Sequence, residues 1–335
     1  MTTDTYFNLY SCCIPVKGYK RMVLCDLQRD KYELLPNALY EILAKFVTKG
    51  KSILQIKEYF NHKYDNYIDE YFSFLESKEY GFFSNQYLKF PKINFKKNYE
   101  PKQITNAIID FIYSSKHTLE IVIPQLNTCS CEALEIRYFY PLHCDELAKQ
   151  LQLTEDSALR DVEVLVEFDN SYSMENLLKL RQKFSRLRKV TVYNSQKNKI
   201  LEHEEIYIIY TKKNISSENY CGIINRWYFV SKTDVFSEAL NFNSCLNKKI
   251  SIDKHGNIKN CPSMKKSYGN IENNSLIDIL NNTDFAEIWK IKKDNIKVCK
   301  DCEFRYICQD CRAYIADPQD IYSKPSKCNY NPYEE

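Results

Sequence analysis

Seven cysteines toward the carboxyl end of the chain have a spacing that suits metal binding. They occur as a separated pair, a close group of four and a single last residue: Cys245 and Cys261; Cys299, Cys302, Cys308 and Cys311; and Cys328. A Cys-x2-Cys pair lets neighbouring thiolates reach adjacent irons of a cubane cluster, and distant cysteines complete the set. Seven thiols make one set of four and leave three. A second cluster then either takes an eighth ligand, for which Cys221 is the nearest candidate, or keeps one iron open.

Zinc is the main alternative to iron. Tetrahedral zinc sites of four thiolates also use Cys-x2-Cys pairs, so the spacing alone leaves the two metals open. Disulfides are not expected, because Met1 to Cys13 lacks the basic and then apolar layout of a signal peptide. We therefore predict thiolate-bound metal in a protein of the reducing cytoplasm.

Other residues give weaker indications of chemistry. Glu167 and Asp169 end a predicted strand, where a carboxylate pair positions an amine or acts as a base, although a helix N-cap or a solvated loop is the commoner role. Cys129 and Cys131 are too close in sequence to hold one edge of a cluster, and we interpret them as free, partly buried thiols. No histidine has a second ligand or nucleophile near it in sequence, so no Cys-His or Ser-His-Asp arrangement is indicated.

Composition argues against several classes of function. The 47 basic and 44 acidic residues are intermixed and leave a net charge of +3, which disfavours a nucleic-acid-binding surface. No run approaches the roughly 18 apolar residues that a membrane span requires. With only 6 glycines and neither a Gly-x-Gly-x-x-Gly nor a Walker motif, the chain has few means of cradling phosphate.

The first part of the chain that would position these residues, 1–85, reads as a small winged helix. Strands over 21–27 and 32–35 precede three amphipathic helices, the first with apolar residues on one face at Leu39, Ile42, Leu43, Phe46 and Val47. Ser52 and Gln55 form a capping box at the start of the second helix. Residues 86–102 are basic and contain two prolines, so we expect a connector there.

The middle of the chain, 103–235, has the α/β pattern of a partial barrel. We expect a helix from the isoleucines of 104–112, further helices over 145–151 and 173–187, and strands over 119–123, 133–140, 161–168, 189–193, 205–210 and 223–230. Strand, helix and strand in succession indicate parallel pairing, with functional residues at the carboxyl ends of the strands. Residues 236–335 form the cysteine-rich part, with a helical insertion over 276–291.

The cysteine pattern Cys-x10-Gly-x4-Cys, Cys-x2-Cys-x5-Cys-x2-Cys, Cys resembles the SPASM domain of radical S-adenosylmethionine enzymes that modify peptides. The resemblance implies two auxiliary 4Fe-4S clusters: an outer one on Cys299, Cys302, Cys308 and Cys328, and an inner one on Cys245, Cys261 and Cys311. Two features depart from the family pattern. Cys308 and Cys311 enclose two residues where the family has three, and Ala239 and Leu240 stand where an eighth cysteine is usual.

A further departure concerns the catalytic cluster. Radical S-adenosylmethionine enzymes hold it with Cys-x3-Cys-x2-Cys after the first barrel strand, and these 335 residues contain no such triplet. Cys129 and Cys131 are expected near the right place but supply only two ligands. The glycine-glycine-glutamate that the family uses for the cofactor's amino group is also absent. The resemblance therefore implies no reductive cleavage of S-adenosylmethionine, and whether the protein is an enzyme stays open.

The chain as a whole is similar to the SPASM-domain peptide maturases of grasp-with-spasm systems. The similarity includes CCIPVKG and CDLQRDKYELLPN near the start and CEFRYICQDCRAYI near the end. It implies maturation of a ribosomally synthesised peptide, with the precursor's leader bound at residues 1–85 by strand addition and an ATP-grasp ligase as partner. The alternatives are a non-catalytic adaptor whose metals only hold the fold, and a zinc-ribbon scaffold unrelated to peptide modification.

Overall fold

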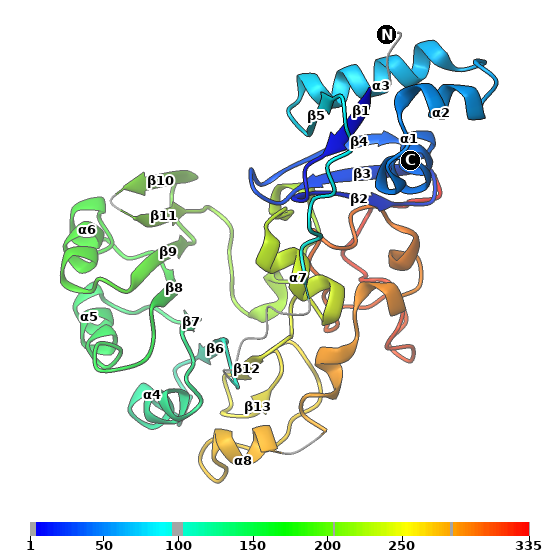
Figure 1. The fold of residues 1–335 in the computed structure, drawn as a ribbon. Helices are drawn as coiled ribbons and strands as arrows, with labels where there is room; N and C mark the ends of the chain where they lie inside the picture. The colour runs from blue at the N-terminus through cyan, green and yellow to red at the C-terminus, as the bar shows by residue number, and fades with distance from the viewer. Residues whose placement is uncertain (1–4, 96–102, 204, 282–283, 335) are drawn as a thin grey trace.

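Three β-sheets organise the structure, a computed structural model that describes residues 5–95, 103–203, 205–281 and 284–334 (Figure 1). Sheets of two and three strands belong to the N-terminal part, and a mixed sheet of eight strands forms the middle of the molecule. The α/β class expected from the sequence is therefore confirmed.

The N-terminal part combines the two small sheets with three helices. The two-stranded sheet pairs β1 (Tyr6–Leu9) with β5 (Gly81–Ser84), and the three-stranded antiparallel sheet has the order β2 (Cys13–Lys17), β3 (Arg21–Asp26), β4 (Lys31–Pro36). The helices are α1 (Asn37–Lys45), α2 (Ile53–Tyr59) and α3 (Asp65–Ser77). The predicted hairpin, the three helices and the capping box of Ser52 and Gln55 are confirmed. Strands β1, β2 and β5 were not predicted.

The large sheet has six parallel strands in its centre and one antiparallel strand at each edge. Its order is β10 (Lys199–His203), β11 (Ile206–Tyr210), β9 (Leu187–Tyr193), β8 (Asp161–Glu167), β7 (Ala133–Tyr138), β6 (Asn106–Phe111), β12 (Lys249–Ile252) and β13 (Ile258–Lys259). Because β12 and β13 come from the cysteine-rich part, that part completes the sheet. The cysteines that flank these strands are thereby brought against the middle of the molecule.

The two faces of the large sheet differ. Helices α4 (Leu119–Thr128), α5 (Cys144–Gln152) and α6 (Met174–Lys183) pack their apolar sides on one face, on alternate residues of the strands such as Ile109, Ile136 and Val164 (Figure 1). The intervening residues point to the opposite face, which carries Asp110, Glu135, Arg137, Glu163 and Lys189. We call this second side the polar face.

Some predicted elements of the middle part are wrong. The isoleucine run of 104–112 is not a helix but contains β6, because a strand buried on both faces reads as a continuous apolar run. The predicted strand over 119–123 is instead the start of α4. Its buried residues Leu119, Val122, Ile123 and Leu126 have helical spacing, which Pro124 disguised in the sequence. The predicted strand over 223–230 is also wrong, since a 3-10 turn lies at Arg226–Tyr228.

Strand β10 of the middle part was not predicted, and the other strands and helices of this part are close to the predictions. Residues 86–95 of the expected connector contain no helix or strand, and residues 96–102 lie outside the described residues. The cysteine-rich part has few regular elements, namely α7 (Thr233–Asn241), α8 (Leu276–Asn281) and short 3-10 helices. The expected helical insertion is two short pieces, α8 and a 3-10 helix at Glu287–Lys290. None of the helices in the described ranges combines the length and apolar character that a membrane span requires.

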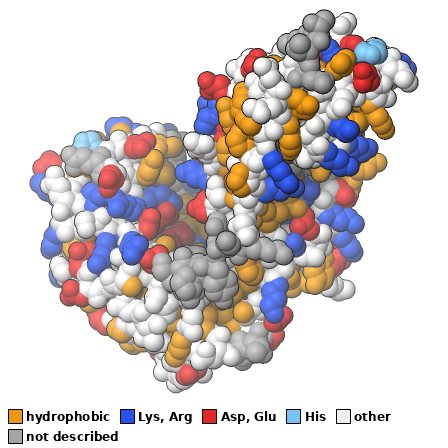
Figure 2. Space-filling view, viewed as in Figure 1, with side chains coloured by type: hydrophobic (Ala, Val, Ile, Leu, Met, Phe, Trp, Pro, Cys, Tyr) orange, Lys and Arg blue, Asp and Glu red, His pale blue; other side chains and the backbone are white. Residues whose placement is uncertain are grey.

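The three-stranded N-terminal sheet lies between two layers. Met22 and Leu24 of β3 face the N-terminal helices, whereas Val23 and Cys25 face Phe304 and Ile307 of the cysteine-rich part. The space-filling view shows hydrophobic side chains gathered over the N-terminal elements at the upper right (Figure 2). Basic and acidic side chains mix over the rest of the face drawn, as the balanced composition predicted.

Candidate metal centre

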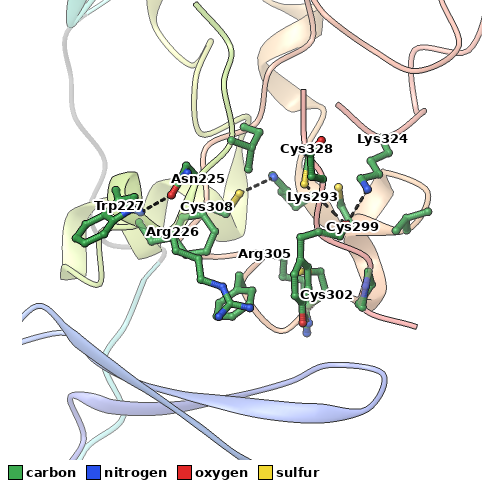
Figure 3. A pocket seen from close by; sticks show the side chains of 17 residues that line it. Asn225, Arg226, Trp227, Lys293, Cys299, Cys302, Arg305, Cys308, Lys324 and Cys328 are labelled. Atoms are coloured by element: carbon green, nitrogen blue, oxygen red, sulfur yellow. Dashed lines mark hydrogen bonds between the residues drawn. The ribbon is translucent and has the colours of Figure 1, made fainter. Parts of the chain in front are cut away.

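Four of the predicted ligands line one cavity of about 560 Å³ (Figure 3). They are the residues expected to hold the outer cluster: Cys299, Cys302, Cys308 and Cys328. Cys299 begins a 3-10 helix at Cys299–Asp301, and the other three lie in loops. Residues as far as 29 positions apart in sequence therefore converge, although the part of the chain that carries them has little regular structure.

The spacing of the sulfur atoms bears on the choice between zinc and an iron-sulfur cluster. Tetrahedral zinc binds thiolates at about 2.3 Å, which places the sulfurs about 3.8 Å apart. Across the described ranges, only Cys12, Cys13 and Asp26 form a set of three or more potential ligand atoms within 4.8 Å of one another. The cysteines of the cavity are thus more widely spaced than a single zinc ion requires. A cubane, in which each thiolate binds a different iron, suits this wider arrangement.

A buried lysine lies against the sulfurs of the outer group. Lys293 is 4% exposed, and its Nζ donates a hydrogen bond to Cys308 Sγ at 3.1 Å (Figure 3). Burial opposes the charge of the ammonium, but Cys308, Cys299 and Asp310 outweigh this and raise the pKa of Lys293. When these cysteines are thiolates, they favour the charged ammonium of Lys293, which can then balance part of their negative charge.

The thiols of the outer group are held in a setting that disfavours their free ionisation. Burial raises the pKa of the Cys299 thiol to about 11, and it also raises the pKa of Cys302 and of Cys308. Without a metal these groups stay protonated at neutral pH. Metal binding must then displace their protons, and the energy of the metal-sulfur bonds becomes folding energy for this part of the chain.

The three cysteines expected in the inner cluster lie together beside the polar face. Electrostatic interactions link Cys311 to Cys245 and Cys245 to Cys261. Lys249, on the polar face of β12, donates from Nζ to Cys245 Sγ at 3.6 Å. The inner group thus resembles the outer group in having a lysine ammonium next to one sulfur.

Cys221 also lies on this side of the molecule. Its Sγ accepts a hydrogen bond from Arg137 Nη1 at 3.1 Å. Arg137 of β7 is 1% exposed and also donates from Nε and Nη2 to the two carboxylate oxygens of Asp110, at 2.6 and 2.8 Å. Burial raises the pKa of Asp110 to about 6, yet this paired carboxylate is still ionised at neutral pH.

The carboxylate candidates have structural partners at the carboxyl end of β8. Glu167 Oε1 accepts a hydrogen bond from Asn194 Nδ2 at 3.0 Å. Asp169 Oδ1 accepts from the Ser171 backbone N–H at 2.8 Å, and hydrogen bonds from Ser171 lower the pKa of Asp169. Neither residue is among those that line the cavity at this end of the sheet. Nor does this pair line the cavity of the four outer cysteines.

Cys129 and Cys131 are not where the sequence analysis expected them. Both are buried and follow α4, at the amino-terminal edge of the sheet, where the Glu132 N–H donates to Thr105 O just before β6. A catalytic cluster of the radical S-adenosylmethionine type belongs after the first barrel strand, at the opposite edge. Placing these cysteines near that position was therefore wrong, because the preceding element was assigned as a strand.

Sequence reasoning missed the close group of Cys12, Cys13 and Asp26. The carboxylate of Asp26 is already engaged, since Oδ1 accepts from the N–H groups of Gln28 and Arg29 at 3.0 and 3.1 Å and Oδ2 pairs with the Arg29 side chain. Asp26 thus serves the turn between β3 and β4. The one sequence signal for this group was that Cys12 and Cys13 are adjacent.

Comparison with protein-family models matches residues 244–303 to SPASM, an iron-sulfur cluster-binding domain. The match includes Cys245, Cys261, Cys299 and Cys302, while the last three cysteines of the pattern lie beyond its end. No significant match was found among curated proteins or among solved structures. The carboxyl-terminal part of this protein therefore carries a SPASM domain, a type of domain that binds iron-sulfur clusters.

Proposed function

We propose that the protein is an iron-sulfur protein that takes part in the maturation of a ribosomally synthesised peptide, together with an ATP-grasp ligase. The observation that carries the proposal is the convergence of Cys299, Cys302, Cys308 and Cys328 on one cavity next to the matched SPASM segment. In this proposal these four cysteines hold an outer 4Fe-4S cluster. Cys245, Cys261 and Cys311 hold an inner one.

The residues of the outer cavity suggest how the protein would balance the charge of the outer cluster and expose it to solvent. A 4Fe-4S cluster supplies one-electron transfer when bound. Lys293 donates a hydrogen bond to one sulfur and contributes a positive charge. Arg226 and Trp227 line the same cavity, and Trp227 is 90% exposed, so the cavity reaches solvent. The chain would thus leave one side of the outer cluster accessible to a partner or to a peptide.

The N-terminal part offers two features that suit a peptide leader. β4 pairs with β3 on one edge, and no strand of the described residues pairs with its other edge, so an extended peptide can add there. The same part of the chain has a groove of about 410 Å³ between α1 and α3, which is lined by Ile42, Phe60, Tyr64, Tyr67 and Tyr71, among others. In this proposal the leader backbone pairs with β4, and the groove offers the peptide a second, apolar contact surface.

An adaptor without cluster chemistry is the second candidate, and one observation favours it. On the polar face, Ile215 packs on Leu165 and Tyr193, and Tyr220 packs beside them. The chain's own segment therefore covers part of the face where a catalytic site of a barrel enzyme would open. In this alternative the metals stabilise the tail, and no S-adenosylmethionine is cleaved in either case.

Metal analysis tests the first part of the proposal. Protein reconstituted anaerobically is expected to bind about eight irons and to be brown, from charge-transfer absorbance. Cys302→Ala should lose about four irons and the fold of the tail, because a structural metal contributes on the order of 10 kcal/mol. Cys12→Ser, outside both groups, is the control and should keep all the iron. Colourless protein that binds zinc would favour the zinc scaffold.

A second experiment separates enzyme from adaptor. A short precursor peptide and an ATP-grasp ligase of the proposed kind are incubated with and without this protein, and the products are compared by mass spectrometry. A mass change that requires this protein but survives Cys245→Ala and Cys311→Ala supports the adaptor. A change that those variants abolish supports cluster chemistry. If no mass change depends on this protein, the role in peptide maturation is refuted.

A further inference from the structure

We propose that Cys221 is the fourth protein ligand of the inner site, held in place by the buried pair of Arg137 and Asp110, so that the inner cluster has no iron open to a substrate. This inference rests on the proposed function, because it takes Cys245, Cys261 and Cys311 as iron ligands. It resolves the choice, left open by the sequence, between an eighth ligand and an open iron.

The backbone around Cys221 is fixed from two sides. On the side of the large sheet, the preceding Tyr220 donates from its hydroxyl to Glu135 Oε1 at 3.2 Å. On the side of the tail, Lys327 Nζ donates to the carbonyl oxygens of Asn219 and Cys221 at 2.6 and 2.7 Å. Cys221 is therefore bound between the polar face and the segment that ends at Cys328. A ligand needs such a fixed position if it is to complete a site.

Cys221 is next to the inner group because of the residue that follows it. Gly222 has φ of +81°, and a Cβ at this position would lie 2.9 Å from Cys311 Sγ and 2.8 Å from the Tyr314 ring. A side chain there would collide with both atoms, so the backbone at Gly222 runs close to the Cys311 sulfur. Tyr314 in turn interacts electrostatically with both Cys221 and Cys261. These contacts place Cys221 within the same group of thiols.

The Arg137 guanidinium donates a hydrogen bond to this sulfur as well as to Asp110. Asp110 uses its Nε and Nη2 atoms, which leaves Nη1 for Cys221. A guanidinium keeps its charge in a protein, so Nη1 gives the Cys221 sulfur a charge-assisted hydrogen bond. Because Asp110 and Arg137 are each 1% exposed and lie on neighbouring strands, they hold this donor in one orientation.

The other cysteines do not compete for this role. Six of them lie outside both groups and away from the polar face: Cys12 and Cys13 beside Asp26, Cys25 on the side of β3 that faces the outer site, and Cys129, Cys131 and Cys144 in the core under the helices. Cys221 is the remaining one of the 14. Cys221 is therefore indicated as the eighth ligand both by its location next to the inner group and by the elimination of the other cysteines.

The test compares the loaded wild-type protein with Cys221→Ala and with the control Cys12→Ala. We expect Cys221→Ala to lose about one iron of about eight. On oxidation it should show the electron paramagnetic resonance signal of a three-iron cluster, while the signal that the outer cluster gives on reduction is unchanged. Cys12→Ala should match the wild type. Full iron content and an unchanged spectrum in Cys221→Ala would overturn the inference.

Alkylation of the wild-type protein provides a readout that does not depend on the fold of a variant. With its iron bound, the protein is treated with iodoacetamide and analysed by peptide mass spectrometry. We expect Cys221 to be protected as long as the iron is bound and to react after chelation, whereas Cys12 reacts in both cases. Reaction of Cys221 in the loaded protein, at the rate seen after chelation, would contradict its role as a ligand.

Failure of this inference can be told from failure of the proposed function. Cys245→Ala and Cys311→Ala are measured in parallel. If they disturb the iron while Cys221→Ala does not, the inner cluster exists and has an open iron, so only the assignment of Cys221 is wrong. If none of the three variants changes the iron, the inner cluster itself is refuted.

Discussion

Cations beside sulfur atoms are the recurrent feature at the residue scale. Lys293 donates to Cys308, Lys249 to Cys245 and Arg137 to Cys221. A charged donor at a cluster sulfur stabilises the more negative, reduced state and so raises the reduction potential. Each of these side chains is thus expected to tune a cluster as well as to balance its charge.

The strongest of these contacts gives a prediction for Lys293→Met. A hydrogen bond from a charged donor contributes about 1.5–3 kcal/mol, and about 1.4 kcal/mol corresponds to about 59 mV for one electron. The outer cluster should therefore be harder to reduce by roughly 60–130 mV. A potentiometric titration followed by electron paramagnetic resonance measures this shift. The exposed Lys300→Met is the control, and equal potentials in the three proteins would refute the role of Lys293.

His117 gives a prediction for the effect of pH on stability. It is 2% exposed, stacks on Phe111 and hydrogen-bonds through Nε2 to the Asp110 carbonyl oxygen at 3.0 Å. Burial lowers the pKa of His117, so the native state binds fewer protons than the unfolded chain once the pH falls through about 6.5. The stability that this neutral histidine contributes above that pH is then lost on acidification.

The measurement compares urea unfolding of wild type and His117→Gln at about pH 7.5 and about pH 5.5. Both proteins contain the same carboxylates, so their effects cancel in the difference. The wild type should lose more stability between the two pH values than the variant, which has no imidazole to protonate. Equal losses would show that His117 titrates alike in the native and unfolded states.

At the scale of single elements, α2 depends on its capping box. Ser52 Oγ accepts from the Gln55 N–H, and the Gln55 side chain accepts from the Ser52 N–H. Ser52→Ala should lower the free energy of unfolding by about 1 kcal/mol, because a helix N–H is left without its acceptor. Circular dichroism during urea unfolding measures this loss. Ser52→Gly should lower the free energy of unfolding by only a few tenths of a kcal/mol. A larger loss for Ser52→Gly than for Ser52→Ala would contradict a capping role.

At the scale of the whole molecule, the N-terminal sheet is joined to the outer site. Glu303, 1% exposed, accepts from Arg21 Nε at 2.8 Å and from the hydroxyl of Tyr330, a residue of the outer cavity, at 2.5 Å. A Cβ on Gly18 would lie 2.8 Å from Glu303 Cβ, so the turn between β2 and β3 meets the tail at close range. Peptide binding at β4 would therefore act on a sheet that contacts the cluster cavity.

This junction predicts the effect of Arg21→Met. The change leaves the buried Glu303 carboxylate without its cation and should lower the free energy of unfolding by about 2–3 kcal/mol. Urea unfolding measures the loss. Lys179→Met, which removes an ion pair exposed on α6, is the control and should leave the transition in place. If both variants unfolded at the same urea concentration as the wild type, the junction would not contribute to stability.

Local patterns in the sequence were sufficient for the features that depend on neighbours. The capping box of Ser52, the buried stripe of α1 and the cap of α6 at Ser173 follow from contacts between residues three or four apart. The cysteine pattern likewise carried the resemblance to the SPASM domain, and that resemblance implied the set of four residues that line the outer cavity. Each of these features depends on residues that are close in sequence or that follow a recognisable spacing.

Features that depend on distant partners were decided only by tertiary packing. The run of 104–112 has apolar residues for both a helix and a buried strand, and pairing with β7 and β12 selects the strand. The cysteine pattern cannot reveal that β12 joins the large sheet, and this pairing is what brings Lys249 and the inner group to the polar face. Cys221 and Arg137 are 84 residues apart, and no local spacing relates them. Contacts of this kind exist only once the chain has folded, because the free energy that selects them comes from burial and pairing between remote segments.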